Sequence, residues 1–256
     1  MGYIDNLLRG RKVEWKTLGE VMDVVTDFTA AGSFASNAAN VKYQHSPDYA
    51  LMVRTTDLKN KFSNKQNFVY VNEHAFHYLY RVNLNQESLV LPNVGNCGEI
   101  YHVTPQKLPW PHSVLGPNAL LLKSNTANLR FLFHLFQASY FQKKLSQITS
   151  TVGQTKFNKT NLKTLPIPLP PLDVQEEIAR ILDRFTALEA ELEAELEARQ
   201  KQYEYYRDRL LSAEGIRTMY GEAVKPIALG DLGQLVRGSG LQKKDLTASG
   251  DRKSVV

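Results

Sequence analysis

The chain has 256 residues and 43% of them are hydrophobic, which is enough to bury the core of one large domain or two smaller ones. The single cysteine, Cys97, excludes an internal disulfide, and no stretch contains the roughly 20 apolar residues that a membrane span requires. No apolar signal segment follows Met1, so the expected location is a reducing cytoplasm, with no membrane partner.

The net charge of +5 is unevenly distributed along the chain. Residues 1–170 carry 18 Lys/Arg against 10 Asp/Glu, residues 171–214 carry 6 against 12, and the last 42 residues carry 7 against 4. A basic region followed by an acidic one favours a polyanionic partner for the first and a protein partner for the second. Ordinary scatter of surface charges is the alternative.

Residues 1–164 alternate short apolar runs with Asn, Gly and Pro, which predicts strands joined by turns. One helix is predicted in NTANLRFLFHLFQASYFQKKL, residues 125–145, where apolar residues recur at helical spacing and Asn125 is placed to cap the start. The expected fold class is therefore α+β, a globular mixed α/β domain followed by a long helix. The predicted strands are residues 49–55, 67–71, 87–92, 98–103 and 118–123.

A proline-rich segment, LPIPLPPLDVQEEIARIL, occupies residues 165–182. Proline fixes φ and lacks an amide donor, so the four prolines favour an extended, rigid path over a helix. Asp173 then stands at the expected N-cap of a helix, with Glu176 three residues later as in a capping box.

The helix predicted from Asp173 continues without Pro or Gly to Glu214, about 42 residues or roughly 60 Å. Its apolar residues recur in steps of 3 and 4, with one stutter between Leu188 and Leu196, which predicts a coiled-coil seam. A solvated single helix is the alternative, because Glu and Ala favour helix in any setting. The predicted seam, for a dimer or a partner, consists of Val174, Ile178, Ile181, Phe185, Leu188, Leu192, Leu196, Tyr203, Tyr206 and Leu210.

Two distant segments resemble each other, WKTLGEVMDVV near the N-terminus and PIALGDLGQLV after the long helix. Residues 18–20 match residues 229–231, and Val25 matches Val236, at a constant offset of 211. Such internal similarity predicts the start of a second copy of the first domain. The expected organisation is a globular domain at 1–164, a proline-rich exit with a long helix at 165–214, and the incomplete start of a second such domain at 215–256.

Sequence motifs for catalysis or cofactor binding are absent. The chain has no G-x-x-x-x-G-K-[ST], no G-x-G-x-x-G and no G-x-S-x-G motif. Cys97 and His102 form the closest mixed pair of metal-binding residue types, but no other residues complete a zinc spacing. We therefore expect no catalytic residue, no metal and no cofactor.

The run GQTKFNKTNLKTLPIPLPPLDVQEEIARILDRF, residues 153–185, resembles the specificity subunits of type I restriction-modification enzymes. The W-K-x-L-G-E motif at residues 15–20 is similar to the start of their target recognition domains. The resemblance implies a non-catalytic subunit that reads half of a bipartite double-stranded DNA target and docks methyltransferase and endonuclease subunits. The long helix would then act as a ruler between half-sites.

The sequence departs from that family pattern because the second recognition domain stops after its opening and the second helix is missing. The chain is either a truncated gene product or a natural half-subunit that forms a homodimer through its long helix and reads a palindromic target. Two rivals remain open: a nuclease or fused restriction-methylation enzyme, and a coiled-coil adaptor that binds protein rather than DNA.

Candidate DNA contacts follow from side-chain chemistry, because Arg, Asn and Gln distinguish base edges whereas Lys contacts phosphates. Two polar segments have this composition, residues 54–67 and the loop at 153–161. A solvated loop residue is the alternative at each position. The base-reading candidates are Arg54, Asn64, Gln66, Gln154 and Asn158, and the phosphate candidates are Lys59, Lys61, Lys65, Lys156 and Lys159.

Overall fold

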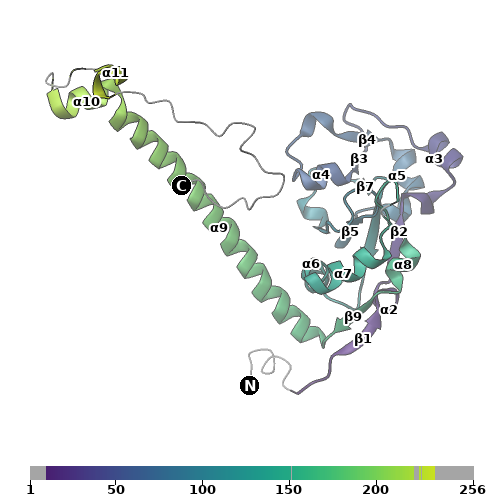
Figure 1. Cartoon of the computed structure of the whole chain (residues 1–256). Helices are drawn as coiled ribbons and strands as arrows, with labels where there is room; N and C mark the ends of the chain where they lie inside the picture. The colour runs from purple at the N-terminus through teal and green to yellow at the C-terminus, as the bar shows by residue number, and fades with distance from the viewer. Residues whose placement is uncertain (1–9, 151, 222–224, 226, 234–256) are drawn as a thin grey trace, which may run out of the picture. The chain divides into compact units, whose positions relative to one another are not determined.

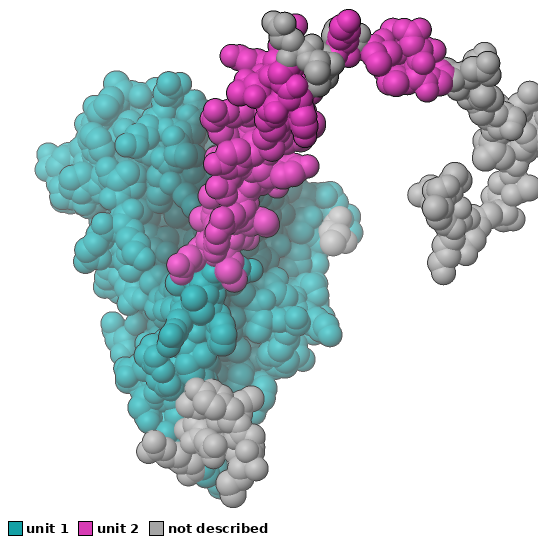
Figure 2. Space-filling model, turned by 90° about the vertical axis from the view of Figure 1, so that its left-hand side faces the viewer, with its two compact units in different colours: residues 1–189 teal, residues 190–256 magenta. Residues whose placement is uncertain are grey.

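The computed structural model describes residues 10–150, 152–221, 225 and 227–233. The chain divides into two compact units, residues 1–189 and residues 190–256, which are coloured separately in Figure 2. Val236 and the rest of the predicted second copy from residue 234 onward lie outside the described residues. Within the described part of the chain, no helix is long and apolar enough to cross a membrane.

Three small sheets organise the first unit, with strand orders β1-β9, β2-β8-β5-β6 and β4-β3-β7. All pairs are antiparallel except β3 with β7, which is parallel. The strands are β1 (Glu14–Thr17), β2 (Val24–Asp27), β3 (Ala50–Val53), β4 (Val69–Val71), β5 (Ser88–Pro92), β6 (Tyr101–Val103), β7 (Ser113–Leu115), β8 (Ala119–Lys123) and β9 (Pro166–Leu169).

The four-stranded sheet is the middle layer of this unit. Successive residues of a strand point to opposite faces of a sheet, and on this sheet both faces are covered. On β8, Leu120 and Leu122 belong to a hydrophobic cluster with α6, α7 and α8, whereas Leu121 belongs to a second cluster with β3, β4 and β7. Burial on both faces explains why this strand reads as a continuous apolar run. Figure 1 shows α6, α7 and α8 at a different level of the unit from the three-stranded sheet of β3, β4 and β7.

The helices of the first unit are mostly short, and they connect or cover the strands. The long helix α9 has 40 residues and begins in the first unit and ends in the second. The α-helices are α2 (Leu18–Val21), α3 (Phe34–Asn40), α4 (Thr55–Lys59), α5 (Glu73–Tyr78), α6 (Leu129–Gln137), α7 (Ser139–Ile148), α8 (Lys159–Lys163), α9 (Leu172–Leu211), α10 (Ala213–Tyr220) and α11 (Leu229–Leu232), and the 3-10 helices are η1 (Phe28–Ala31), η2 (Lys65–Asn67), η3 (Tyr80–Val82) and η4 (Pro105–Lys107).

The fold class is confirmed as a mixed α/β domain followed by a long helix, and each predicted strand contains an observed one. Some predicted ends are wrong: Thr55 belongs to α4 with Arg54 as its N-cap, residue 67 belongs to η2, and β6 begins at Tyr101, three residues after the predicted start. Arg54 ends the strand, since its amide donates to the Asp57 carboxylate at 2.9 Å and begins a helical turn.

The single helix predicted at residues 125–145 is two helices, α6 and α7, separated by Ala138 in an extended conformation. The cap is Asn128 rather than Asn125, because Asn128 Oδ1 accepts from the amide of Phe131 at 2.9 Å. The break allows Phe136 and Phe141 to stack at 4.2 Å between ring centroids, both fully buried. Tertiary packing therefore overrides a continuous helical pattern here.

The proline-rich segment is extended, as predicted, but it is a strand rather than a free spacer. β9 pairs with β1 in an isolated two-stranded sheet, and Ile167 is fully buried. Pro166 and Pro168 are tolerated because β9 has one partner only, so every second amide position has no ladder acceptor, and the two prolines occupy alternate positions.

The predicted ends of the long helix are corrected at both termini. α9 begins at Leu172, so Asp173 lies inside the first turn, where its carboxylate accepts from Arg11 Nη1 at 2.8 Å rather than capping. The helix ends at Leu211, three residues before the predicted Glu214, because Ser212 starts α10 by accepting from the amide of Gly215 at 2.9 Å.

The repeated motif forms the same local structure in both places, a four-residue helix preceded by an extended residue. The environments differ: Leu18 is fully buried and its amide donates to the Leu165 carbonyl at 2.8 Å, whereas Leu229 is 80% exposed. The local sequence therefore produces the helix without the packing that buries it in the first copy.

Candidate nucleic-acid interface

The first candidate segment, residues 54–67, is organised by an ion pair between Arg54 and Asp57. The guanidinium donates to both carboxylate oxygens, at 2.9 and 2.8 Å, and to the Asn67 carbonyl at 2.6 Å. Asp57 is buried, so the pair holds α4 against the chain near η2. Arg54, predicted as a base reader, therefore has a structural role that occupies three of its N–H donors.

A polar pocket of about 380 Å³ lies beside this ion pair. Arg54 and Asp57 form part of its wall, and the remaining lining side chains are amides, a hydroxyl and an imidazole. Such groups are the donors and acceptors that discriminate base edges. They are His45, Thr56, Asn60, Asn64 and Asn67.

The turn that follows α4 has an unusual backbone. Lys61 and Phe62 have φ values of +48° and +57°, a left-handed conformation that non-glycine residues rarely adopt. The Phe62 ring contacts Phe68 edge-to-face, with ring centroids 6.2 Å apart, which anchors the turn, while Lys61 is exposed. Strained turns of this kind are concentrated at functional sites.

Lys59, in the same segment, forms an ion pair. Its ammonium contacts Glu99 at 2.6 Å, and Glu99 also accepts from the Tyr101 hydroxyl at 2.5 Å. Burial by itself raises the pKa of the Glu99 carboxyl, but the hydrogen bonds from Lys59 and Tyr101 outweigh it, and the net pKa is lowered. To contact a DNA phosphate, the Lys59 ammonium must therefore either break its ion pair with Glu99 or contact both groups at once.

The second candidate segment, residues 153–161, is held by the loop at residues 93–99. The amide of Gly95 donates to the Thr155 carbonyl at 2.8 Å, and Lys156 exchanges backbone hydrogen bonds with Ser150 at 2.8 and 3.0 Å. Its backbone is thus fixed while the Lys156 side chain is exposed. The loop prediction is wrong for residues 159–161, which belong to α8, whereas the part before α8 is held by contacts with neighbouring backbone.

The structure brings both candidate segments to one loop, because residues 93–99 contact Lys59 through Glu99 and residue 155 through Gly95. Not every candidate is free: Asn158 caps α8 by accepting from the amide of Asn161 at 2.7 Å, and Lys159 contacts Asp27 at 3.3 Å. All ten candidates stay predictions, and eight of them are exposed: Lys59, Lys61, Asn64, Lys65, Gln66, Gln154, Lys156 and Asn158.

Sequence reasoning missed His45, Asn60 and Gln175 as functional candidates. His45 lies outside both candidate segments and reaches the pocket only through folding, whereas Asn60 lies within the identified segment and has the same amide chemistry as Asn64. Gln175 had a signal, since it ends the P-L-P-P-L-x-x-Q motif. Its buried side chain accepts from the Asn128 amide at 2.9 Å and donates to the Pro170 carbonyl at 2.8 Å, which joins α6 to the proline-rich segment.

The predicted seam divides into a covered part and an exposed part. Val174 is 2% exposed, and Ile178 packs against the cluster that contains α6 and α7. These two residues therefore face the chain's own domain and are not available to a partner. The seven exposed seam residues are Phe185, Leu188, Leu192, Leu196, Tyr203, Tyr206 and Leu210.

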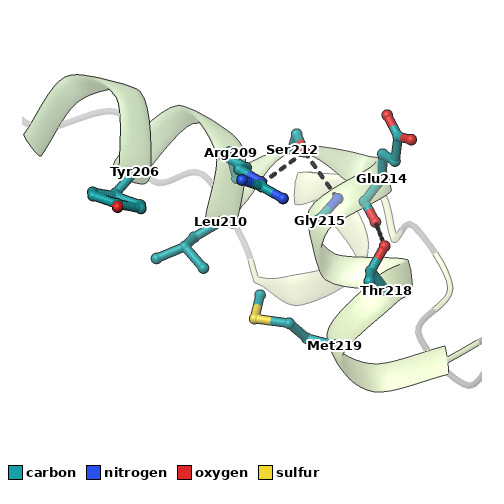
Figure 3. A pocket seen from close by; sticks show the side chains of 8 residues that line it. All are labelled: Tyr206, Arg209, Leu210, Ser212, Glu214, Gly215, Thr218 and Met219. Carbon is teal, nitrogen blue, oxygen red and sulfur yellow. Dashed lines mark hydrogen bonds between the residues drawn. The ribbon is translucent and has the colours of Figure 1, made fainter. Parts of the chain in front are cut away.

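The end of α9 and the start of α10 enclose a pocket of about 440 Å³, whose lining side chains are labelled in Figure 3. Leu210 and Met219 point toward the same space. Gly215 is required for this tight turn, because a Cβ there would lie 1.9 Å from the Arg209 carbonyl oxygen. The seam residues Tyr206 and Leu210 of α9 thus line one pocket together with side chains of α10.

No group of three or more His, Cys, Asp or Glu that could hold a metal ion occurs within the described residues. The charged side chains around Asp183 are paired with one another. The arrangement offers polar and basic recognition groups around residues 54–67.

The family pattern described as "Type I restriction modification DNA specificity domain" matches residues 11–198, which include the domain and the first part of α9. This range is more than half of the chain. The chain therefore belongs to the type I restriction-modification DNA specificity family, and the predicted resemblance is confirmed.

Curated relatives agree with this assignment. The chain is 30% identical over 260 residues to a putative type I restriction enzyme specificity subunit of Haemophilus influenzae, which covers 97% of this chain and 57% of that protein. It is 62% identical over 55 residues to a type I restriction enzyme specificity subunit of Escherichia coli, covering 20% of this chain and 14% of the relative. The chain thus spans little more than half the length of the first of these relatives.

A solved chain from a structural study of complex assembly and conformational transition in a type I restriction-modification system has a similar fold. Its TM-score is 0.53 at 18% identity, and the match covers 76% of this chain and 44% of that chain. At this identity the likeness concerns the fold alone.

Proposed function

We propose that the chain is a non-catalytic DNA-recognition subunit of a type I restriction-modification system, which reads one half of a bipartite target. The observation that carries the proposal is the family match over residues 11–198. The polar pocket beside α4 and the exposed lysines around it support a role in DNA contact.

The half-subunit arrangement is part of the same proposal. Phe185 and the six seam residues after it form an exposed apolar stripe, and long apolar stripes on soluble helices are normally covered by a partner. Two copies paired antiparallel through this stripe would carry two recognition domains and read a palindromic target. In the complete system, methyltransferase and endonuclease subunits would dock on the assembly.

The first test is the mass of the full chain by light scattering, followed by selection of bound duplexes from a randomised DNA pool. The expected results are a dimer of twice 29.0 kDa and an inverted repeat in the selected DNA. A monomer that binds DNA would remove the dimer from the proposal. A chain that selects no duplex, or that binds equally at all salt concentrations, contradicts DNA recognition and favours the adaptor function.

Phosphate contacts are tested by the double variant Lys61→Ala/Lys65→Ala. Each lost phosphate contact should reduce the slope of log affinity against log salt by about 1, so we expect a decrease of about 2. Lys143→Ala/Lys144→Ala on α7 is the matched control and should leave the slope unchanged. An equal decrease in both variants would mean that net charge, rather than the segment at residues 54–67, governs binding.

Base reading is tested by Asn64→Ala and Asn60→Ala, which remove amides from the pocket wall. Each substitution should relax the selected sequence at one position of the half-site, equivalent to about 1–3 kcal/mol of discrimination. Gln202→Ala, on the exposed part of α9, is the control. An unchanged selected sequence in both pocket variants removes this pocket as the reading site.

A further inference from the structure

The first turns of α9 are embedded in the folded domain. Val174, Gln175 and Ala179 are all buried, and Ile178 packs against the cluster beneath α6 and α7. Beyond Asp183, by contrast, every residue of α9 from 184 to 211 is exposed. Among the described residues of α9, Asp183 is therefore the last that hydrogen-bonds to the folded domain.

Asp183 is clasped from two positions on α6. Arg130 Nε donates to Asp183 Oδ2 at 3.0 Å and Arg130 Nη2 donates to Oδ1, while His134 Nε2 lies 2.7 Å from the same Oδ1. A two-pronged guanidinium pair restrains both distance and orientation. We call these three side chains the Asp183 clasp.

The clasp is itself supported by the sheet. Arg130 Nη1 lies 3.1 Å from His102 Nδ1, and His102 Nε2 lies 2.5 Å from Glu87. Because Arg can only donate, His102 must accept at Nδ1 and carry its proton at Nε2, directed at Glu87. The Arg130 guanidinium also lies 5.1 Å from the Phe133 ring centre. The contacts with His102 and Phe133 therefore restrain the Arg130 side chain independently of its contact with α9.

A small angular change at Asp183 has a large effect at the end of α9. Asp183 and Leu211 are 28 residues apart in one helix, about 42 Å at about 1.5 Å per residue. A rotation of about 5° at Asp183 would displace Leu211 by about 4 Å, close to the rise of about 3.4 Å per base pair. An added base pair also turns a half-site by about 35° around the DNA axis.

We propose that Asp183 is a positioning residue, and that its clasp to Arg130 and His134 fixes the direction of α9 and thereby the spacing between half-sites that the assembly accepts. This inference rests on the proposed two-headed DNA reader. It assigns to the clasp a role separate from reading bases, because none of its three side chains lines the pocket beside α4.

The direction of α9 is tested by electron-spin distance measurement on the full chain with Cys97→Ser, labelled at Thr160→Cys and Ala194→Cys, both exposed positions. Unlabelled chain in excess removes distances between copies. The expected result is a narrow distance distribution that broadens in Asp183→Asn. A distribution that stays equally narrow in Asp183→Asn overturns the proposal.

Spacing selectivity is tested with duplexes that carry two selected half-sites separated by the preferred gap, or by one or two base pairs more or fewer. The parent should prefer one gap by about tenfold or more, whereas Asp183→Asn should bind the gaps within about threefold while keeping its affinity for a single half-site. A variant that retains the parental preference overturns the proposal.

The controls separate this proposal from misfolding and from the proposed function. Asp183→Glu keeps the carboxylate and should recover much of the preference, whereas Glu189→Gln, exposed on the same helix, should change nothing. If Asp183→Asn unfolds, His134→Gln removes one arm of the clasp and should give an intermediate loss; an unchanged preference there contradicts the clasp. If the parent binds no DNA, the proposed function and the spacing role both fail.

Discussion

The two parts of α9 share one heptad-like pattern but have opposite environments. In residues 172–183 the seam face is covered by the chain's own domain, with Val174 at 2% and Ala179 at 4% exposure and Ile178 packed against the cluster that contains α6 and α7. In residues 184–211 equivalent side chains are exposed, as Leu192 is at 66%. The apolar period thus predicts that a face is buried, but it does not say by what.

The comparison also shows how the covered part is held. In the covered part, Gln175 and Asp183 attach the helix to α6 through polar contacts. In the exposed part, salt bridges between neighbouring residues of the helix, such as Arg199 with Glu195, are solvent-exposed. Exposed pairs of this kind contribute little to stability. We therefore expect substitutions to act on folding in the first part and on association in the second.

The largest effect is expected from Val174→Asp, which places an unpaired charge in a buried site. It should lower the free energy of unfolding by about 3–5 kcal/mol. Leu192→Asp is the matched substitution in the exposed part and should change folding by no more than about 0.5 kcal/mol. Chemical denaturation of both variants is the measurement, and similar losses would contradict the division of the helix.

Gln175→Ala should have the next largest effect. It removes two hydrogen bonds and leaves the Asn128 amide and the Pro170 carbonyl without their partner, a loss of about 2–3 kcal/mol. Gln200→Ala, at an exposed position, is the control. Equal unfolding midpoints for the two variants in urea would show that the Gln175 contacts do not hold the proline-rich segment to α6.

The pH dependence of stability should be smaller and should depend on His102. Burial lowers the pKa of this imidazole, and the Glu87 contact offsets that only in part, with Arg130 and Lys107 acting in the same direction as burial. The unfolded chain therefore binds more protons, so stability should fall as the pH drops below about 6.5, until the folded-state pKa is passed. His102→Gln should flatten this part of the stability curve, and an identical curve would exclude His102 as the source.

The smallest effect on folding is expected from Leu196→Lys, in the exposed part of α9. Its consequence should appear in association, because a charge in the apolar stripe opposes pairing of two copies. Light scattering should show a shift from twice 29.0 kDa toward 29.0 kDa, with the near-ultraviolet spectrum of the domain retained. Gln202→Lys is the control, and dimers that persist in the Leu196 variant would place the contact elsewhere.

Much of the fold was predictable because its signals are local. Each run of β-branched and leucine residues bounded by Asn, Gly or Pro contains a strand, and the Glu/Ala-rich segment is a helix. The division into α6 and α7 was not predictable, since the break at Ala138 serves the stacking of Phe136 on Phe141. Element ends are decided by such contacts more than by propensity.

The candidate site was predictable as two segments but not as individual roles. Lysine and asparagine composition identified residues 54–67, yet it could not show that Arg54 is committed to Asp57 or that Asn60 reaches the pocket. The partners of a polar side chain come from distant parts of the chain. Composition therefore indicates where binding groups gather, while the fold decides which of them are available.

The sequence alone determined the family, the α+β class, the extended proline-rich segment and the long helix, because each depends on short-range chemistry or on a motif. The tertiary structure decided that the proline-rich segment is a strand paired with β1, that Gln175 and Asp183 attach α9 to α6, and that the apolar stripe is exposed only from Phe185 onward. These facts required the fold, because each joins residues that are distant in the chain.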